Sequence, residues 1–258
     1  TKDSGMSPAT PTVQGGDVVS WEIHPTLPTG LSIDSLTGTI SGTPAGTSPI
    51  SSYTVYANNT GGSATAVLTI EILEAPPSSI TYVPGSFTLT KGTPLGAVTV
   101  TAQGDPVDVW SISPTLPLGL VFDTTNGELS GTPTAVSPLT TYTVTATNNG
   151  GSGTTTITIQ VNDVAPSSIT YTPNFLELNK DTLMTTVTPT NQGGTVDTWS
   201  ITPTLPNGLV FDTATGSISG TPTDVTAQAT YTVTGSNTGG SATATVTVII
   251  NDAAPTSI

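Results

Sequence analysis

The sequence repeats itself with a period of 89 residues, and this repetition constrains the fold more than any other feature of the chain. The three tryptophans are spaced by that interval, and so are the only three basic residues. The aligned triplets are Trp21, Trp110 and Trp199; Tyr53, Tyr142 and Tyr231; Asp34, Asp123 and Asp212; and Lys2, Lys91 and Lys180. Because the register holds without insertion or deletion, the chain is a tandem array of one structural unit.

The aligned sequences also predict the unit boundaries. We expect a repeat lacking its first strand at 1–77, complete repeats at 78–166 and 167–255, and the start of a next repeat at 256–258. The stretches ITYVPGSFTL and ITYTPNFLEL, which open the two complete repeats, have no counterpart before Thr1. One interpretation is that the chain is a window cut from a longer array. The alternative is that the first unit borrows its missing strand from a neighbouring chain.

Within a unit, the apolar residues alternate with polar ones. In the stretch YTVTATN, Tyr142, Val144 and Ala146 alternate with threonines, and the same period of two returns in TTTITIQV after the turn NNGGS. This pattern predicts a β-hairpin. A second hairpin is expected where LVFD and ELSG flank DTTNG, and further strands around VWSI, AVTVTA and ITYVPGSFTL. The total is about seven strands per unit, and no window has the apolar spacing of a helix.

Seven short strands in about 89 residues are typical of an immunoglobulin-type β-sandwich. The single tryptophan of each unit falls near the third strand, and a tyrosine opens the penultimate one, as that fold favours. The chain has no cysteine, so aliphatic and tryptophan packing must stabilise each core without a disulfide. The sequence therefore predicts an all-β fold: tandem seven-stranded immunoglobulin-like β-sandwiches in a linear array.

The charge of the chain excludes several classes of function. Three basic residues stand against 17 acidic ones, which gives a formal net charge of -14. We therefore expect no nucleic-acid partner and no polybasic contact with anionic lipid, because both need cations. No apolar run reaches the ~20 residues that membrane insertion requires. The chain has one histidine and no arrangement of nucleophile, base and acid, so we expect no enzyme activity and no catalytic residues.

The repeated motif resembles a known family. WSISPTLPLGLVFDTTNGELSGTPT followed by YTVTATNNGGSGTTTITIQVND is similar to the Ig-like repeats of large bacterial and archaeal surface proteins, relatives of the dystroglycan-type, cadherin-like domains. Related strings occur in the other two units, so the resemblance covers the whole chain. It implies a secreted protein in which such repeats act mostly as spacers of adhesins, stalks or surface layers, while the binding tip lies elsewhere.

The unit junctions contain the candidate metal ligands. Asn162 with Asp163, and Asn251 with Asp252, resemble the Asn-Asp linker that helps ligate interdomain calcium in cadherins. Calcium takes six to eight oxygen ligands, usually including several carboxylates, and each linker supplies only one. Asp105, Asp108, Asp181 and Asp197 would complete a site if the fold brought them near. The other interpretation is a short linker stiffened by proline, with side chains that cap backbone groups.

The repeated aspartates and the aromatic residues each allow a functional interpretation as well as a structural one. Asp34, Asp123 and Asp212 head D-x-x-[TN]-G turns, where an aspartate accepts backbone N–H bonds and the glycine adopts a positive φ. We interpret them as turn residues, with calcium ligation as the alternative. Most aromatic residues fall at core-facing positions in register, which argues against a carbohydrate-binding platform.

The sequence as a whole favours a structural segment of an extracellular tandem array at a prokaryotic cell surface. Such a segment serves as a filament, stalk or adhesin spacer. Its expected partners are neighbouring repeats and other copies of itself, because uncharged rows of threonine and serine on outward strand faces tolerate lateral packing. The alternative function is a calcium-dependent adhesive or carbohydrate-binding module.

Overall fold

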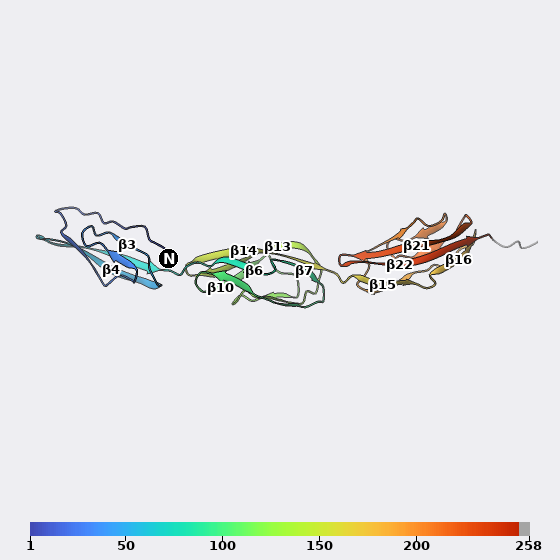
Figure 1. The fold of residues 1–258 in the computed structure, drawn as a ribbon, viewed down its shortest axis with the longest axis horizontal. Helices are drawn as coiled ribbons and strands as arrows, with labels where there is room; N and C mark the ends of the chain where they lie inside the picture. The colour runs from blue at the N-terminus through green and yellow to red at the C-terminus, as the bar shows by residue number, and fades with distance from the viewer. Residues whose placement is uncertain (253–258) are drawn as a thin grey trace, which may run out of the picture.

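A computed structural model describes residues 1–252 as three β-sandwich units arranged end to end in a rod (Figure 1). No helix occurs among these residues. This arrangement confirms the prediction of an all-β linear array. The N-terminus lies beside the junction of the first and second units, because the backbone N–H of Lys2 donates to the carbonyl of Leu73, 2.8 Å away. The expected start of a next repeat at 256–258 lies outside the described residues.

The second unit contains nine strands in two facing layers. They are β6 (Ser78–Tyr82), β7 (Ser86–Thr90), β8 (Leu95–Val98), β9 (Val100–Gln103), β10 (Val109–Ser113), β11 (Leu120–Phe122), β12 (Leu129–Gly131), β13 (Ser137–Asn148) and β14 (Gly151–Asn162). One sheet has the order β10-β13-β14-β7, with β7 parallel to β14. The other layer is formed by β11-β12-β8 and by the pair β6-β9.

Nine strands replace the expected seven because two of the predicted strands are divided. The stretch ITYVPGSFTL changes partner around Pro84: β6 pairs with β9, whereas β7 pairs with β14 in the opposite sheet. The stretch AVTVTA divides at Thr99, so that β8 pairs with β12 and β9 with β6. The segment 78–90 therefore belongs to both layers and connects them. The alternating pattern alone does not show this.

The third unit repeats this arrangement. Its strands are β15 (Pro166–Tyr171), β16 (Phe175–Asn179), β17 (Pro189–Gly193), β18 (Thr198–Thr202), β19 (Leu209–Phe211), β20 (Ile218–Gly220), β21 (Thr226–Asn237) and β22 (Gly240–Asn251). The main sheet has the order β16-β22-β21-β18, and β15 pairs with β17. A single bridge between Val187 and Ile218 stands where β8 pairs with β12 in the second unit.

The first unit has only five strands: β1 (Ser20–His24), β2 (Leu31–Ile33), β3 (Ile40–Gly42), β4 (Ser48–Asn59) and β5 (Gly62–Ile72). Its main sheet is β1-β4-β5, so β5 is an edge strand, whereas β14 and β22 lie inside their sheets. The aligned positions explain the difference, since the counterparts of β6 and β7 would precede Thr1.

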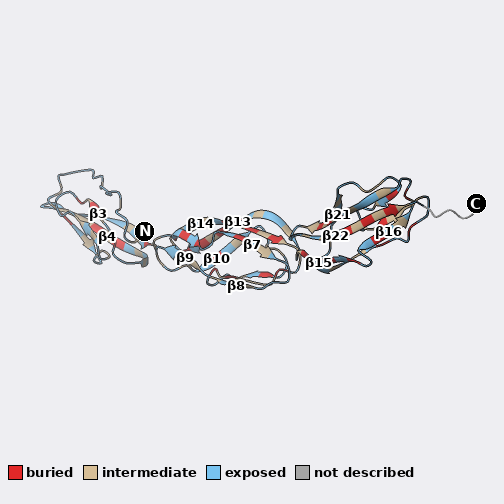
Figure 2. Ribbon diagram, turned by 45° about the vertical axis from the view of Figure 1, so that its right-hand side comes forward, coloured by how far each residue is buried: buried red, intermediate tan, exposed pale blue. Residues whose placement is uncertain are grey.

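The cores of the second and third units are tightly closed. Figure 2 shows buried residues along the central strands, and Ile157, Ile159 and Val144 are essentially inaccessible to solvent. The aligned tryptophans are buried in all three units, and Tyr142 is buried at the position predicted for it. These observations confirm that alternation identifies the inward face of each long strand.

A second buried tyrosine closes the sandwich, and the sequence did not single it out. The hydroxyl of Tyr82 in β6 donates to the carbonyl oxygen of Gly127 at 2.5 Å, and Tyr171 in β15 makes the aligned bond to Gly216. Burial raises the pKa of the Tyr82 phenol to about 12. Each of these bonds joins the first strand of a unit to the D-x-x-[TN]-G turn of the same layer, which in the second unit connects β11 and β12.

Candidate functional site

The predicted ligands Asn162 and Asp163 lie at the junction of the second and third units. Asn162 ends β14, and its side-chain oxygen accepts a hydrogen bond from the Gln160 amide at 2.8 Å. The carboxylate of Asp163 accepts the backbone N–H of Val164 at 3.1 Å and lies 3.9 Å from the ammonium of Lys91. Asp163 therefore caps the linker and faces a cation from the preceding unit.

Asn251 and Asp252 occupy the aligned place at the far end of the third unit. The side-chain amide of Asn251 donates to the carboxylate of Glu177 at 3.0 Å, and its backbone carbonyl accepts the N–H of Lys180 at 2.9 Å. Asp252 is exposed and is the last described residue. The structure thus places all four predicted ligands at unit ends.

The donor set at these ends contains fewer carboxylates than calcium normally takes. Among residues 1–252, no three histidine or acidic side chains gather closely enough to hold a metal ion. Asp105 lies at the other junction, where it binds the Lys2 ammonium at 2.6 Å and the Ala75 N–H at 2.8 Å. Both hydrogen bonds lower the pKa of Asp105, and the bond from Lys2 has the larger effect. Interdomain calcium therefore stays a prediction.

The turn interpretation of the repeated aspartates is confirmed. Asp123 accepts the hydroxyl and the backbone N–H of Thr125, at 2.6 and 2.8 Å, and these hydrogen bonds lower the pKa of the carboxyl. Asp34 accepts the N–H groups of the residues two and three positions on, and Asp212 accepts the N–H of the residue two positions on. The three carboxylates act as local caps of the β-turn.

The hairpin turn between β13 and β14 of the second unit lies against the linker around residues 74–75, which leads from the first unit to the second. The side-chain amide of Asn148 donates to the carbonyls of Ala75 and Pro106, at 2.8 and 3.3 Å, and its oxygen accepts the N–H of Gly150 at 3.0 Å. Asn149 accepts the N–H of Glu74 at 2.9 Å. Asn148 is only 5% exposed, so these bonds satisfy polar groups that are shielded from water.

The same contacts recur one period later, between the second and third units. The side-chain amide of Asn237 donates to the carbonyls of Val164 and Thr195, at 2.7 and 2.8 Å. Thr238, in the place of Asn149, accepts the N–H of Asp163 at 2.9 Å. We call each of these turns, 148–151 and 237–240, a junction clamp. Both clamps bind backbone atoms of the linker, so they do not depend on the linker's side chains.

Close approach of the two backbones accounts for the first glycine of each clamp, and the positive φ of Gly151 and Gly240 accounts for the second. A Cβ atom on Gly150 would overlap the carbonyl oxygen of Glu74, and one on Gly239 would overlap that of Asp163. The sequence indicated these glycines as hairpin turns, which is correct, but it did not reveal their contact with the linker. The repeated N-x-G-G pattern was the available signal, and a turn alone also explains it.

Comparison with known proteins also indicates three tandem Ig-like domains. Three consecutive matches to the family described as "Putative Ig domain" cover residues 1–73, 76–162 and 165–251. Over 157 residues the chain is 31% identical to the "Serine-rich adhesin for platelets" of Staphylococcus aureus, a match that spans 60% of this chain and 6% of that protein. The protein of the same name from strain USA300 is 30% identical over 162 residues, which are 62% of this chain and 7% of that one.

Among solved structures, the N-terminal eight Ig domains of Down Syndrome Cell Adhesion Molecule superpose with a TM-score of 0.50. The match covers 98% of this chain and 35% of that one at 15% sequence identity, and it shows the fold alone. The chain thus spans a small fraction of the length of the adhesins that it matches. Within the part of the chain that is described, no helix is long and apolar enough to cross a membrane.

Proposed function

The chain belongs to the "Putative Ig domain" family, and from that premise we propose that it is a structural spacer of an extracellular, cell-surface array. In this role the three units maintain a fixed length and orientation, as in a stalk, filament or adhesin shaft, and they perform no catalytic step. The observation that carries the proposal is the pair of junction clamps, because at both junctions they fix the linker that arrives from the preceding unit to the unit that follows, through equivalent contacts with backbone carbonyls.

The clamps favour a stiff rod over a chain of units joined by flexible linkers. Each clamp receives the linker through an asparagine side chain and a second polar side chain, so a bend at the linker would break several hydrogen bonds together. At the first junction the ion pair of Lys2 and Asp105 adds a further contact across the linker, with its carboxylate only 15% exposed. Adjacent units that share such interfaces gain stability from one another.

The surface chemistry supports an extracellular setting. Acidic residues outnumber basic ones by 17 to 3, so like chains repel one another at long range. The outward positions of the longest strands are mostly threonine, which suits an exposed β-face. The relatives named as staphylococcal adhesins support placement at a cell surface.

Small-angle X-ray scattering of the full chain tests the spacer proposal. The longest strand of each complete unit has 12 residues, which at ~3.3 Å each makes a three-unit rod at least about 120 Å long. For the natural chain we expect the distribution of interatomic distances to extend to a maximum dimension of at least about 120 Å. The double variant Asn148→Ala with Asn237→Ala should give a broad distribution of shorter distances while keeping its β-sheet circular dichroism.

Asn126→Ala is the matched control, because Asn126 makes its hydrogen bond within a turn of one unit. It should scatter like the natural chain. If the natural chain already samples bent shapes as widely as the double variant, the clamps do not hold the rod straight and the spacer proposal loses its basis.

A further inference from the structure

In the second and third units, the second strand lies beside the last strand in the same sheet. β7 pairs in parallel with β14 over five residue pairs, and β16 pairs in parallel with β22 over five. Neither pairing contains a register shift, whereas the pairings β6–β9 and β15–β17 each contain one. We call the two uninterrupted pairings the parallel ladders. They connect the segment by which the chain enters a unit to the strand by which it leaves.

The parallel ladders run along the axis of the rod (Figure 1). β14 begins in the junction clamp that holds the linker from the first unit, and it ends at Asn162, next to the linker to the third unit. β7 runs in the same direction, so its beginning faces the first junction and its end faces the second. Tension on the two linkers therefore pulls β7 and β14 in opposite directions along their length. Because the hydrogen bonds of a parallel pair are evenly spaced, such sliding strains them together.

The ladder of the second unit is closed by hydrogen bonds at both ends. At its beginning the backbone N–H of Thr158 donates to the carbonyl of Gly85 at 3.1 Å, and at its end the N–H of Lys91 donates to the carbonyl of Asn162 at 2.8 Å. The hydroxyl of Thr158 also donates to that of Ser86 at 2.8 Å. Backbone and side-chain bonds thus join the same two strands.

The ladder of the third unit is closed in the same way. The N–H of Thr247 donates to the carbonyl of Asn174 at 2.8 Å, and the N–H of Lys180 donates to that of Asn251 at 2.9 Å. The side-chain amide of Asn251 donates to the carboxylate of Glu177 at 3.0 Å. The arrangement is therefore a property of the repeat and recurs from one unit to the next.

The inward side of each ladder is shielded from water. In the second unit Phe87 is 4% exposed, Ile159 is inaccessible and Val161 is 1% exposed. In the third unit Leu176 and Val248 are buried at the same place. Water can therefore compete for the ladder hydrogen bonds only from the outward side, and an intact ladder loses little by exchange with solvent.

Most of each unit lies outside the path that tension follows. Strands β8 to β13 come between β7 and β14 in the sequence, so a pull on the linkers stretches them only after the ladder has parted. The exception is β6, which is met first. Its pairing with β9 has a register shift, and the hydroxyl of Tyr82 holds it to the carbonyl of Gly127. The ladder is therefore the longest regular pairing that tension must break.

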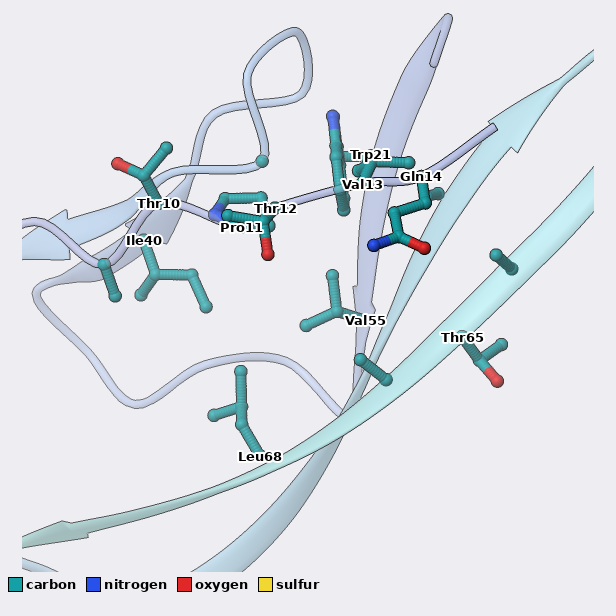
Figure 3. A pocket seen from close by; sticks show the side chains of 15 residues that line it. Thr10, Pro11, Thr12, Val13, Gln14, Trp21, Ile40, Val55, Thr65 and Leu68 are labelled. Carbon is teal, nitrogen blue, oxygen red and sulfur yellow. The ribbon is translucent and has the colours of Figure 1, made fainter. Parts of the chain in front are cut away.

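The first unit of the described chain has no parallel ladder. Its last strand, β5, pairs only with β4. Beside β5, Val55 and Leu68 line a hollow of about 330 Å³ next to the segment 9–14 (Figure 3). The inference that follows concerns the second and third units alone.

We propose that the second and third units resist tension along the rod through their parallel ladders, each of which parts in a single step. A spacer needs only a fixed length, and this adds the capacity to keep that length under a pulling force. The inference rests on the spacer proposal, because tension reaches the units only in a chain held at both ends. Scattering reports the shape of the rod without force, so a straight rod with weak ladders would refute this inference alone.

The test pulls the second unit of the full chain in two directions with optical tweezers. The chain has no cysteine, so a pair of introduced cysteines gives unique handles. Ser78→Cys with Val164→Cys applies force at the two ends of the unit and slides the ladder. Thr93→Cys with Val164→Cys applies force where β7 and β14 end side by side and opens the ladder one pair at a time. All three positions are exposed.

The two directions should give different rupture forces for the same folded unit. We expect the sliding direction to need at least about twice the force of the opening direction, because several hydrogen bonds must break together. Rupture in the sliding direction should release the whole unit, Ser78 to Asn162, as one extension of about 250 Å. Similar unfolding of both variants in denaturant without force is the control for stability.

Two matched leucine variants separate the ladder from the rest of the core. Leu89 lies in β7 and Leu95 in β8, and both are partly buried against the same apolar cluster. Leu89→Ala and Leu95→Ala should lose similar stability in denaturant. Forced unfolding depends on the unfolding rate, to which contacts still intact at the barrier contribute nothing. At a fixed sliding force, Leu89→Ala should therefore rupture about tenfold faster, and Leu95→Ala within about threefold of the parent.

Three results would overturn the proposal. The first is an equal rupture force in the two pulling directions. The second is rupture of Leu95→Ala as fast as that of Leu89→Ala at the same force. The third is extension of the unit in the sliding direction by a series of small steps in place of one large one.

Discussion

Replacing Asn148 with alanine removes three hydrogen bonds from the first junction clamp at once. Two of them reach carbonyls of the linker and of the 104–108 loop, and the third caps the turn itself. Asn148 is 5% exposed, so water replaces the lost bonds poorly. At about 1 kcal/mol for each good bond and less for the longest one, we expect Asn148→Ala to lower the unfolding free energy of the second unit by ~2–3 kcal/mol.

Differential scanning calorimetry of the full chain measures this loss, and hydrogen exchange assigns the transition to a unit. For a domain of this size, 2–3 kcal/mol corresponds to a midpoint about 10–20 °C lower. The matched control is Asn59→Ala, because Asn59 holds the aligned position in the first unit but is exposed there and bonds only Asp17 and Gly61. Its cost should be at most about 1 kcal/mol.

The comparison of these two variants decides whether the clamp stabilises the junction. If Asn148→Ala destabilises its unit no more than Asn59→Ala does, the hydrogen bonds to the linker contribute nothing beyond capping a turn. The reasoning from burial would then be wrong, and the linker would be held by apolar packing alone.

Three more outcomes are expected. Gly239→Ala should cost about 1–3 kcal/mol through backbone overlap with the linker, whereas Gly61→Ala should be nearly neutral in calorimetry. Burial favours the neutral form of Tyr82 in the folded state, so its contribution to stability is complete below pH 10 and is lost as the pH rises toward about 12. The variant Tyr82→Phe should therefore show a smaller loss of unfolding free energy between pH 10 and about 12. Thermal scans of the full chain in excess calcium and in chelator test the predicted interdomain site: a midpoint higher by several degrees in calcium supports ligation at Asn162 and Asp163, and superimposable scans contradict it.

Much of this molecule could be predicted from its sequence. The period of 89 residues predicted equivalent units, and alternation predicted the hairpin β13–β14 with Tyr142, Val144 and Ala146 facing inward. The repeated aspartates were correctly interpreted as turn caps. All of these features are local, since they depend on residues a few positions apart along one strand or turn.

Other features depend on residues that are distant in sequence, and the sequence pattern did not reveal them. Asn148 and Ala75 are 73 positions apart, and their contact exists only because the end of one hairpin meets the preceding linker. The division of β6 from β7 likewise depends on which sheet lies beside each half, not on the hydrophobic pattern. A turn signal such as N-x-G-G is the same whether or not a backbone packs on it.

The sequence by itself thus determined the repeat, the strands, the inward faces and the acidic, cation-poor surface. Only the tertiary structure decided that the carboxylate of Asp163 faces a capping N–H and a lysine, and that asparagine side chains clamp both junctions. The physical reason is that periodicity records how a side chain points from its own strand. What that side chain contacts depends on which other segment occupies the space in front of it.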